Sequence, residues 1–173
     1  VNELPFSTVY PGTPFAPGGR FAADIVDQTV LIIDLQTGQE IILDDPFNGS
    51  YPDHVSISWS VDGALLAVQR YDWDEVNNGP AVTGLAVYMA DGLLYRYYAN
   101  TRSWLWAADS SYRLLTAVGD YFENGEPCIL DTQINTVDCL GEVTTWRNND
   151  GTIGYYEWLP DGSGISFLYW NRG

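Results

Sequence analysis

Trp59-Ser60-Val61-Asp62-Gly63-Ala64-Leu65-Leu66-Ala67 is the stretch of sequence that decides the fold. It places an aromatic residue before a short turn, and the turn is followed by an apolar run typical of a β-strand. Segments of the same form begin at Phe15, Trp106 and Trp158 and align with it without gaps. Successive starts are separated by 44, 47 and 52 residues, so the chain is built from a repeated unit.

The repeat length predicts the fold class. Repeats of about 40–50 residues made of short strands are typical of β-propellers, in which each repeat is one blade of four antiparallel strands. Between the repeated segments, apolar runs are broken by Gly, Asn and Asp, and no helical pattern of useful length occurs. We therefore predict an all-β chain with three complete blades and one partial blade, either open or part of a larger ring. A single propeller region spans residues 1–173, with blades at about 6–43, 54–98, 103–140 and 153–173.

The repeated segment has a physical reason for its residue types. Proline presets the first turn position, Asp accepts hydrogen bonds from the turn backbone and Gly takes a positive φ, so one strand reverses into the next within a few residues. The aromatic residue before the turn recurs at the repeat period, which indicates that it fills the gap between blades. We interpret Trp59, Trp106 and Trp158 as blade-packing residues rather than ligand-stacking residues.

The pattern resembles the TolB-like and WD-repeat-like β-propellers of bacteria. Their blades carry an aromatic-Ser-Pro-Asp-Gly signature and a strand that ends in Asp before a Thr-Gly turn, which residues 59–67, 158–162 and 33–38 match. The sequence departs from the signature at Phe15, Gly18, Val61 and Ser110. The resemblance covers nearly the whole chain and implies an architecture rather than an activity.

The fourth repeat is shorter than the others and ends soon after its second strand. An open propeller exposes a strand edge and an apolar blade face, which favours pairing with another segment. Three interpretations remain open. The 173 residues are part of a longer chain, the N-terminal segment 6–10 supplies the missing pairing, or several copies of the chain close a ring.

Cys128 and Cys139 flank a predicted hairpin in the third repeat. If the turn is centred between Gln133 and Ile134, the two cysteines lie directly opposite each other and can form a cross-strand disulfide. Such a bond implies an oxidising compartment, so we expect a periplasmic, cell-surface or extracellular protein. We expect no metal site, since His54 is the only histidine and there is no Cys-x-x-Cys motif.

Loop lengths predict a binding face. In a blade, the first–second and third–fourth connections lie at one end, here called the short-turn end, and the other connections lie at the opposite, long-loop end. The long connections predicted at the long-loop end are residues 44–54, 70–82, 119–126 and 141–152, and binding is usually built on such loops. The binding-face candidates in them are Asp44, Asp45, Asp53, His54, Asp72, Trp73, Asp74, Glu75, Glu123, Glu126, Trp146, Arg147 and Asp150.

The chemistry of these candidates fits a sugar, a cationic peptide or a calcium ion. The densest cluster, residues 72–75, departs from the calcium-loop pattern because Val76 occupies the next ligand position and no Gly follows it. We therefore expect no cofactor, with calcium as the alternative.

The charge balance excludes several functions. Seven Arg and no Lys stand against 23 acidic residues, which gives a net charge of −16. Binding of nucleic acid needs clustered cations, and the seven arginines are spread singly along the chain. No apolar run approaches the roughly 20 residues that a membrane-spanning helix needs, so we expect neither a nucleic-acid partner nor a membrane span.

The sequence favours a binding module over an enzyme. It has no Gly-x-Ser-x-Gly motif, no phosphate-binding loop and no dinucleotide fingerprint. We expect a non-catalytic propeller module for protein–protein interaction or assembly, acting through the long-loop end or the open blade edge. The alternative is a carbohydrate-binding or glycoside-cleaving propeller that uses loop carboxylates with Trp73 or Trp146.

Overall fold

The structure, a computed structural model, describes residues 14–27, 29–47, 54–74, 79–109, 111–118, 126–139 and 151–171. Within these ranges the chain forms thirteen β-strands and no helix. The prediction of an all-β chain is confirmed.

The strands form four antiparallel sheets that follow the chain order. The first contains β1 (Phe21–Val26), β2 (Thr29–Asp34) and β3 (Gln39–Ile42), and the second contains β4 (His54–Trp59), β5 (Leu65–Asp74), β6 (Gly79–Met89) and β7 (Leu94–Ala99). The third contains β8 (Thr101–Trp106), β9 (Arg113–Val118), β10 (Glu126–Asp131) and β11 (Thr136–Cys139), and the last contains β12 (Gly151–Trp158) and β13 (Ile165–Asn171).

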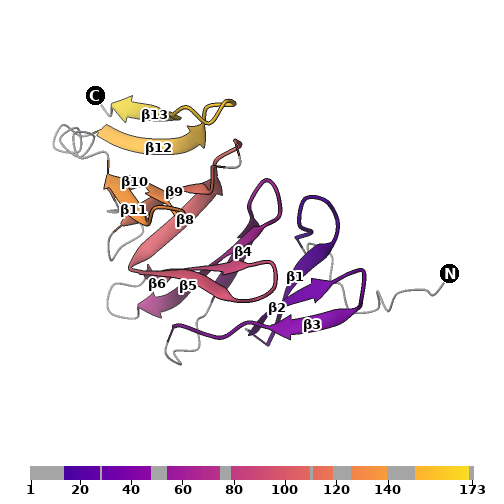
Figure 1. Cartoon of the computed structure of the whole chain (residues 1–173). Helices are drawn as coiled ribbons and strands as arrows, with labels where there is room; N and C mark the ends of the chain where they lie inside the picture. Colours follow the sequence, from indigo (N-terminus) through magenta and orange to yellow (C-terminus); the bar gives the residue numbers. More distant parts are fainter. Residues whose placement is uncertain are drawn as a thin grey trace.

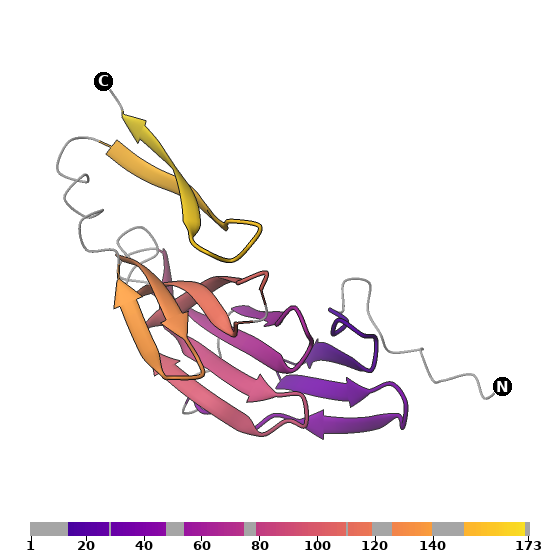
Figure 2. The same cartoon turned by 45° about the horizontal axis from the view of Figure 1, so that its top comes forward.

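Each sheet is one blade, and the blades stand side by side in an arc that does not close into a ring (Figures 1 and 2). The second and third blades have all four predicted strands. In the first blade, the described part of the innermost strand is an isolated bridge between Phe15 and Ala22. Residues 6–10, which we considered as a source of pairing for the last blade, lie outside the described residues.

The three repeated tryptophans connect each blade to the one before it. The indole Nε1–H of Trp59 donates to the carbonyl of Pro14 at 3.1 Å, and that of Trp106 donates to the carbonyl of Ser58 at 3.1 Å. Trp158 donates in the same way to Leu105 at 3.0 Å. In every case the acceptor is the residue directly before the repeated aromatic residue of the preceding blade.

Apolar side chains fill the gaps between the blades around these tryptophans. The first interface buries Ile32 and Tyr88 with Trp59, and the second buries Leu85, Val87 and Leu114 with Trp106. The third is smaller, with Ala107, Leu115 and Trp158 as its buried members. Trp59, Trp106 and Trp158 are 9%, 6% and 7% exposed, whereas Phe15 is 53% exposed. The tryptophans therefore pack the blades together, as predicted.

The turns at the short-turn end also fit against one another. Gly63 has a φ of 72°, and a Cβ at this position would lie 2.7 Å from the carbonyl oxygen of Pro17 in the preceding turn. Gly162 has a φ of 68°, and a Cβ at this position would lie even closer to the carboxyl group of Asp109. Only glycine combines this backbone conformation with so close an approach.

One detail of the repeat alignment is wrong. The turn of the second blade is closed by a hydrogen bond from the Ser60 amide to the Leu65 carbonyl, whereas in the third blade the Ala107 amide bonds to Arg113, one residue further along. The third turn therefore contains an extra residue, and the gap-free alignment fails after Asp109. Tyr112 takes a φ of 55°, which allows the longer turn to rejoin the strand in register.

The cysteine pairing is as predicted. Cys128 on β10 and Cys139 on β11 are direct register partners and form a disulfide bond. The Asp131 carboxylate caps the turn between these strands by accepting hydrogen bonds from the amides of Gln133 and Ile134.

The indole hydrogen bond can be tested by Trp106→Phe. This substitution keeps an aromatic ring between the blades but removes the donor to the Ser58 carbonyl, so we expect the free energy of unfolding to fall by about 1–3 kcal/mol. Urea denaturation followed by circular dichroism measures the change. Phe15→Leu, at the exposed equivalent position, is the matched control and should cost less than about 1 kcal/mol. An unchanged unfolding midpoint for Trp106→Phe would contradict the role of the hydrogen bond.

Candidate functional site

The structure describes part of the predicted binding face at the long-loop end. Of the candidates, Asp44 and Asp45 follow β3, His54 begins β4, Asp72, Trp73 and Asp74 end β5, and Glu126 begins β10. The remaining candidates, Asp53, Glu75, Glu123, Trp146, Arg147 and Asp150, lie outside the described residues.

The long-loop end contains more regular structure than predicted. Residues 70–82 were expected to form a loop, but β5 continues to Asp74 and β6 begins at Gly79. Aromatic residues alternate with Asp at positions 71–74, and this period-two pattern pairs in register with the opposite strand. His54 lies in a strand opposite Tyr71 rather than in a turn. The connection between the second and third blades is also tight, since Asn100, with a φ of 51°, is the single residue between β7 and β8.

The two central strands of the second blade, β5 and β6, extend as an arm at its long-loop end. Among the described residues, β4 stops pairing with β5 at His54–Tyr71, and β7 stops pairing with β6 at Ala99–Gly84. Residues 72–74 and 79–83 therefore continue as a two-stranded ribbon, which we call the β5–β6 arm. The pairing shifts by one residue between Arg70 and Tyr71, so the arm leaves the sheet at a β-bulge. A bulge bends the strand and increases its twist.

A salt bridge lies at the base of the arm. Arg70, the last β5 residue before the bulge, extends its guanidinium to the Asp45 carboxylate, with Nη1 3.1 Å from Oδ2. The Arg70 side chain is 9% exposed and that of Asp45 is 38% exposed. The guanidinium also lies over the ring of Phe47, 5.0 Å from its centre. Asp45 in turn accepts a hydrogen bond from the Phe47 amide at 2.9 Å. The salt bridge and the ring contact thus join residues 45–47, which follow the last strand of the first blade, to the second blade.

Two tyrosines of the second blade complete this cluster. Tyr97 packs edge-on against Phe47, with ring centres 5.4 Å apart, and Tyr88 donates its hydroxyl proton to the carbonyl of Asp44 at 2.6 Å. Burial, followed by the nearby Asp45 carboxylate, raises the pKa of Tyr88 far above its ordinary value. Tyr88 therefore remains a hydrogen-bond donor at any physiological pH.

Sequence reasoning identified Asp44 and Asp45 but missed Phe47, Arg70, Tyr88 and Tyr97. A signal for one of them was present, because Arg70 is a charged residue at the end of an apolar run, and a buried charge needs a partner. The identity of that partner, 25 positions away, is visible only in the folded chain. Asp44 and Asp45 both take part in interblade packing here, through a carbonyl and a carboxylate respectively.

Among the described residues, no group of three or more His, Cys, Asp or Glu side chains is placed to hold a metal ion. Both cysteines are joined in the disulfide. In the same part of the chain, no helix is long and apolar enough to cross a membrane.

At the opposite, short-turn end, the repeated Asp residues act within the turns. Asp62 accepts hydrogen bonds from Ser60 and Ala64 of its own turn, and from the Tyr112 hydroxyl of the next blade. Asp161 accepts the amide and hydroxyl protons of Ser163. These contacts confirm that the turn Asp residues accept hydrogen bonds from the turn backbone, so part of the acidity of the chain is structural.

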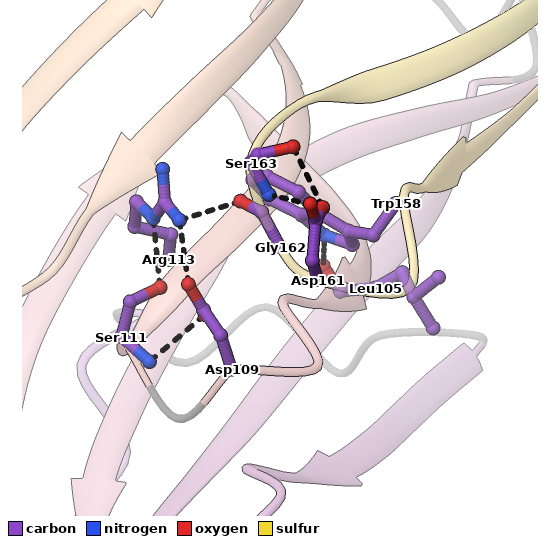
Figure 3. A network of polar contacts seen from close by, with 8 residues as sticks. All are labelled: Leu105, Asp109, Ser111, Arg113, Trp158, Asp161, Gly162 and Ser163. Atoms are coloured by element: carbon purple, nitrogen blue, oxygen red, sulfur yellow. Dashed lines mark hydrogen bonds and ion pairs between the residues drawn. The ribbon is translucent and has the colours of Figure 1, made fainter.

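Figure 3 shows the polar contacts that join the turn of the third blade to the turn of the fourth. Arg113 forms a salt bridge with Asp109 at 2.8 Å and donates to the carbonyl of Gly162 at 2.7 Å. Its guanidinium also lies 5.3 Å from the ring centre of Trp158. Hydrogen bonds from Ser111, together with Arg113, hold the pKa of Asp109 below its ordinary value.

Comparison with solved structures identifies the architecture. Dipeptidyl peptidase 4 of Porphyromonas gingivalis matches 91% of this chain with a TM-score of 0.55 and 16% sequence identity. The fold is that of a β-propeller. TolB from Acinetobacter baumannii matches 95% of the chain with a TM-score of 0.43 and 14% identity. The β-propeller domain of the Trilobed protease from Pyrococcus furiosus matches 94% with a TM-score of 0.40 and 11% identity. The prediction of a β-propeller is confirmed.

The matches extend over only part of the larger proteins. This chain spans 28% of the Porphyromonas gingivalis peptidase and 45% of the Acinetobacter baumannii TolB. No protein-family model and no curated protein sequence matches the chain. At these sequence identities the comparisons establish the fold, and the function has to be argued from the site.

The salt bridge at the base of the arm can be tested by Asp45→Asn. The substitution removes the Asp45 carboxylate from the buried Arg70 guanidinium, so we expect a loss of about 1–3 kcal/mol in the free energy of unfolding. The double variant Asp45→Asn/Arg70→Met should have a free energy of unfolding about 1 kcal/mol higher than the sum of the two single changes predicts. Strictly additive changes in urea denaturation would contradict the coupling.

The Asp109 network predicts a dependence of stability on pH. Because the folded-state pKa of Asp109 is lowered, its contribution is present above the unfolded-state carboxyl pKa of about 3.9 and is lost as the pH falls through the lower folded-state value. Asp109→Asn removes this contribution, so its stability should fall less steeply with acidification than that of the parent. Asp138→Asn, an exposed position on β11, controls for the change in net charge. The measurement is the free energy of unfolding from urea denaturation at a series of pH values. An equal dependence on pH in the parent and in Asp109→Asn would contradict the role given to Asp109.

Proposed function

We propose that this chain is a non-catalytic β-propeller module that binds a partner protein, and that the β5–β6 arm is the main contact. The observation that carries the proposal is the continuation of β5 and β6 past the ends of their neighbours, β4 and β7. A two-stranded ribbon on a packed blade offers both backbone groups and side chains to a partner.

The base of the arm supports a binding role. Arg70, at the junction, is held by Asp45 and Phe47, so the arm starts from a fixed point on the blade. Binding sites on a rigid support lose less conformational entropy when the partner docks. Asp72 and Asp74 in the arm, followed in sequence by Glu75, favour a partner surface that carries basic residues.

We further propose that the chain acts outside the reducing cytoplasm. The Cys128–Cys139 disulfide supports this, because such bonds persist in the periplasm, at the cell surface and in the extracellular space. The absence of enzymatic activity is likewise part of the proposal. Two titratable groups of the cluster, the Asp45 carboxylate and the Tyr88 hydroxyl, are engaged in packing contacts.

A charge-neutral arm tests the proposal. The variant Asp72→Asn, Asp74→Asn, Glu75→Gln should reduce capture of the partner by about tenfold, because several attractive contacts are lost together. The measurement is affinity capture from the periplasmic and extracellular fractions of the source organism, quantified by mass spectrometry. The control Asp27→Asn, Glu40→Gln, Asp138→Asn changes the net charge equally at exposed positions outside the arm and should retain capture.

Two results would count against a protein-binding arm. One is equal capture by the parent and the charge-neutral arm variant, and the other is the absence of any protein that the parent enriches. Binding on a glycan array, or release of reducing sugar from a polysaccharide, would instead support the carbohydrate-directed alternative based on Trp73 or Trp146.

A further inference from the structure

The outermost strand of the third blade, β11, is unusually open to solvent. Within the described part of the chain it is the edge strand of its sheet and pairs only with β10, through four register pairs. All four of its residues are exposed, including Val137. By contrast, Cys128 and Leu130 on β10 are fully buried. An exposed edge strand of four residues has little packing of its own to hold it in place.

The disulfide fastens this strand at the end opposite the turn. The capped turn lies beside the Asp131–Thr136 pair, and the Cys128–Cys139 pair lies at the other end of the same ladder. The two sulfur-bearing residues have opposite surroundings, since Cys128 is fully buried and Cys139 is exposed. A thiolate from another molecule can therefore approach the Cys139 side of the bond, whereas the sheet covers the Cys128 side.

We propose that the Cys139 sulfur is the point of attack for thiol–disulfide exchange with a protein dithiol, and that this exchange releases strand β11. A thiolate of the partner attacks Cys139 Sγ and forms a mixed disulfide. The bond to Cys128 Sγ breaks, and Cys128 keeps the electron pair and takes up a proton. The second thiol of the partner, after losing its proton, attacks the partner sulfur of the mixed disulfide. Cys139 leaves as a thiolate and is protonated. The partner dithiol is oxidised to a disulfide as the Cys128–Cys139 bond is reduced by two electrons.

Release of β11 would change the surface of the third blade. Without the disulfide, the strand is held by its short backbone ladder and by the Asp131 cap at the turn. When it separates, the outer edge of β10 is uncovered and can accept a strand from another chain. The blade thus contains an edge whose availability depends on the oxidation state of one bond.

Charge defines the kind of thiol that this site favours. Asp138 is the neighbour of Cys139 and is exposed, and the chain as a whole has a net charge of −16. An approaching thiolate is repelled by this field unless it is carried in positively charged surroundings. We therefore expect the partner dithiol to lie on a basic surface.

Small thiols test the point of attack on the native chain. After brief treatment with cysteamine, which is cationic, and trapping with N-ethylmaleimide, peptide mass spectrometry should find the cysteamine adduct on Cys139 in about tenfold excess over Cys128. At low salt, cysteamine should react faster than the anionic thiol glutathione. Asp138→Asn should reduce the ratio of the two reaction rates by about twofold. An adduct shared equally between the cysteines, an adduct mainly on Cys128, or no reaction of the native chain would overturn the proposal.

Hydrogen exchange tests the release of the strand. In Cys128→Ser/Cys139→Ser, and in the parent after reduction with dithiothreitol, amide exchange should accelerate by about tenfold or more in β11 while β8 and β9 keep their protection. Equal exchange in the oxidised and reduced chains would show that the bond does not hold the strand. Loss of protection across the whole third blade would show that the bond only stabilises the fold, and would equally overturn the proposal.

Discussion

One hydrogen bond, repeated three times, sets the arrangement of this molecule. The indole of each repeated tryptophan donates to the backbone carbonyl just before the repeated aromatic residue of the preceding blade. Donor and acceptor both lie at the end of an innermost strand. The contact therefore fixes how far one blade is shifted along the strand direction relative to the next, as well as the distance between the two blades. The apolar interfaces and the close approach of Gly63 and Gly162 to the preceding turns depend on this fixed alignment.

The interfaces are stabilised in different proportions by apolar and polar contacts. The first two bury long aliphatic side chains and Tyr88, whereas the third buries Ala107, Leu115 and Trp158 and adds the Arg113 contacts to Asp109 and Gly162. A buried or half-buried guanidinium appears again at the long-loop end, where Arg70 fastens the exit from the first blade. Arginine suits both places, since its planar group can hydrogen-bond and lie over an aromatic ring at once. With no lysine in the chain, these roles fall to a few of its seven cations.

The features that bear on function are departures from the plain repeat. The β5–β6 arm is a local extension of two strands, and the disulfide is a covalent addition to an otherwise exposed edge. The indole hydrogen bonds between the blades involve neither feature. The Porphyromonas gingivalis dipeptidyl peptidase 4 contains the same architecture, but a shared fold does not by itself give this chain that protein's function.

The sequence by itself determined the repeat, the all-β class, the packing role of Trp59, Trp106 and Trp158, and the pairing of Cys128 with Cys139. Each of these follows from local periodicity or from a short hairpin register, which are properties of residues close together in the chain. Only the tertiary structure decided the longer turn after Asp109, the β5–β6 arm and the partnership of Asp45 with Arg70. These depend on where neighbouring strands stop and on which side chains meet across a blade interface. The turn and the arm are local in sequence, but their limits are set by register with the neighbouring strands, and Asp45 and Arg70 are distant positions that meet only in the folded chain.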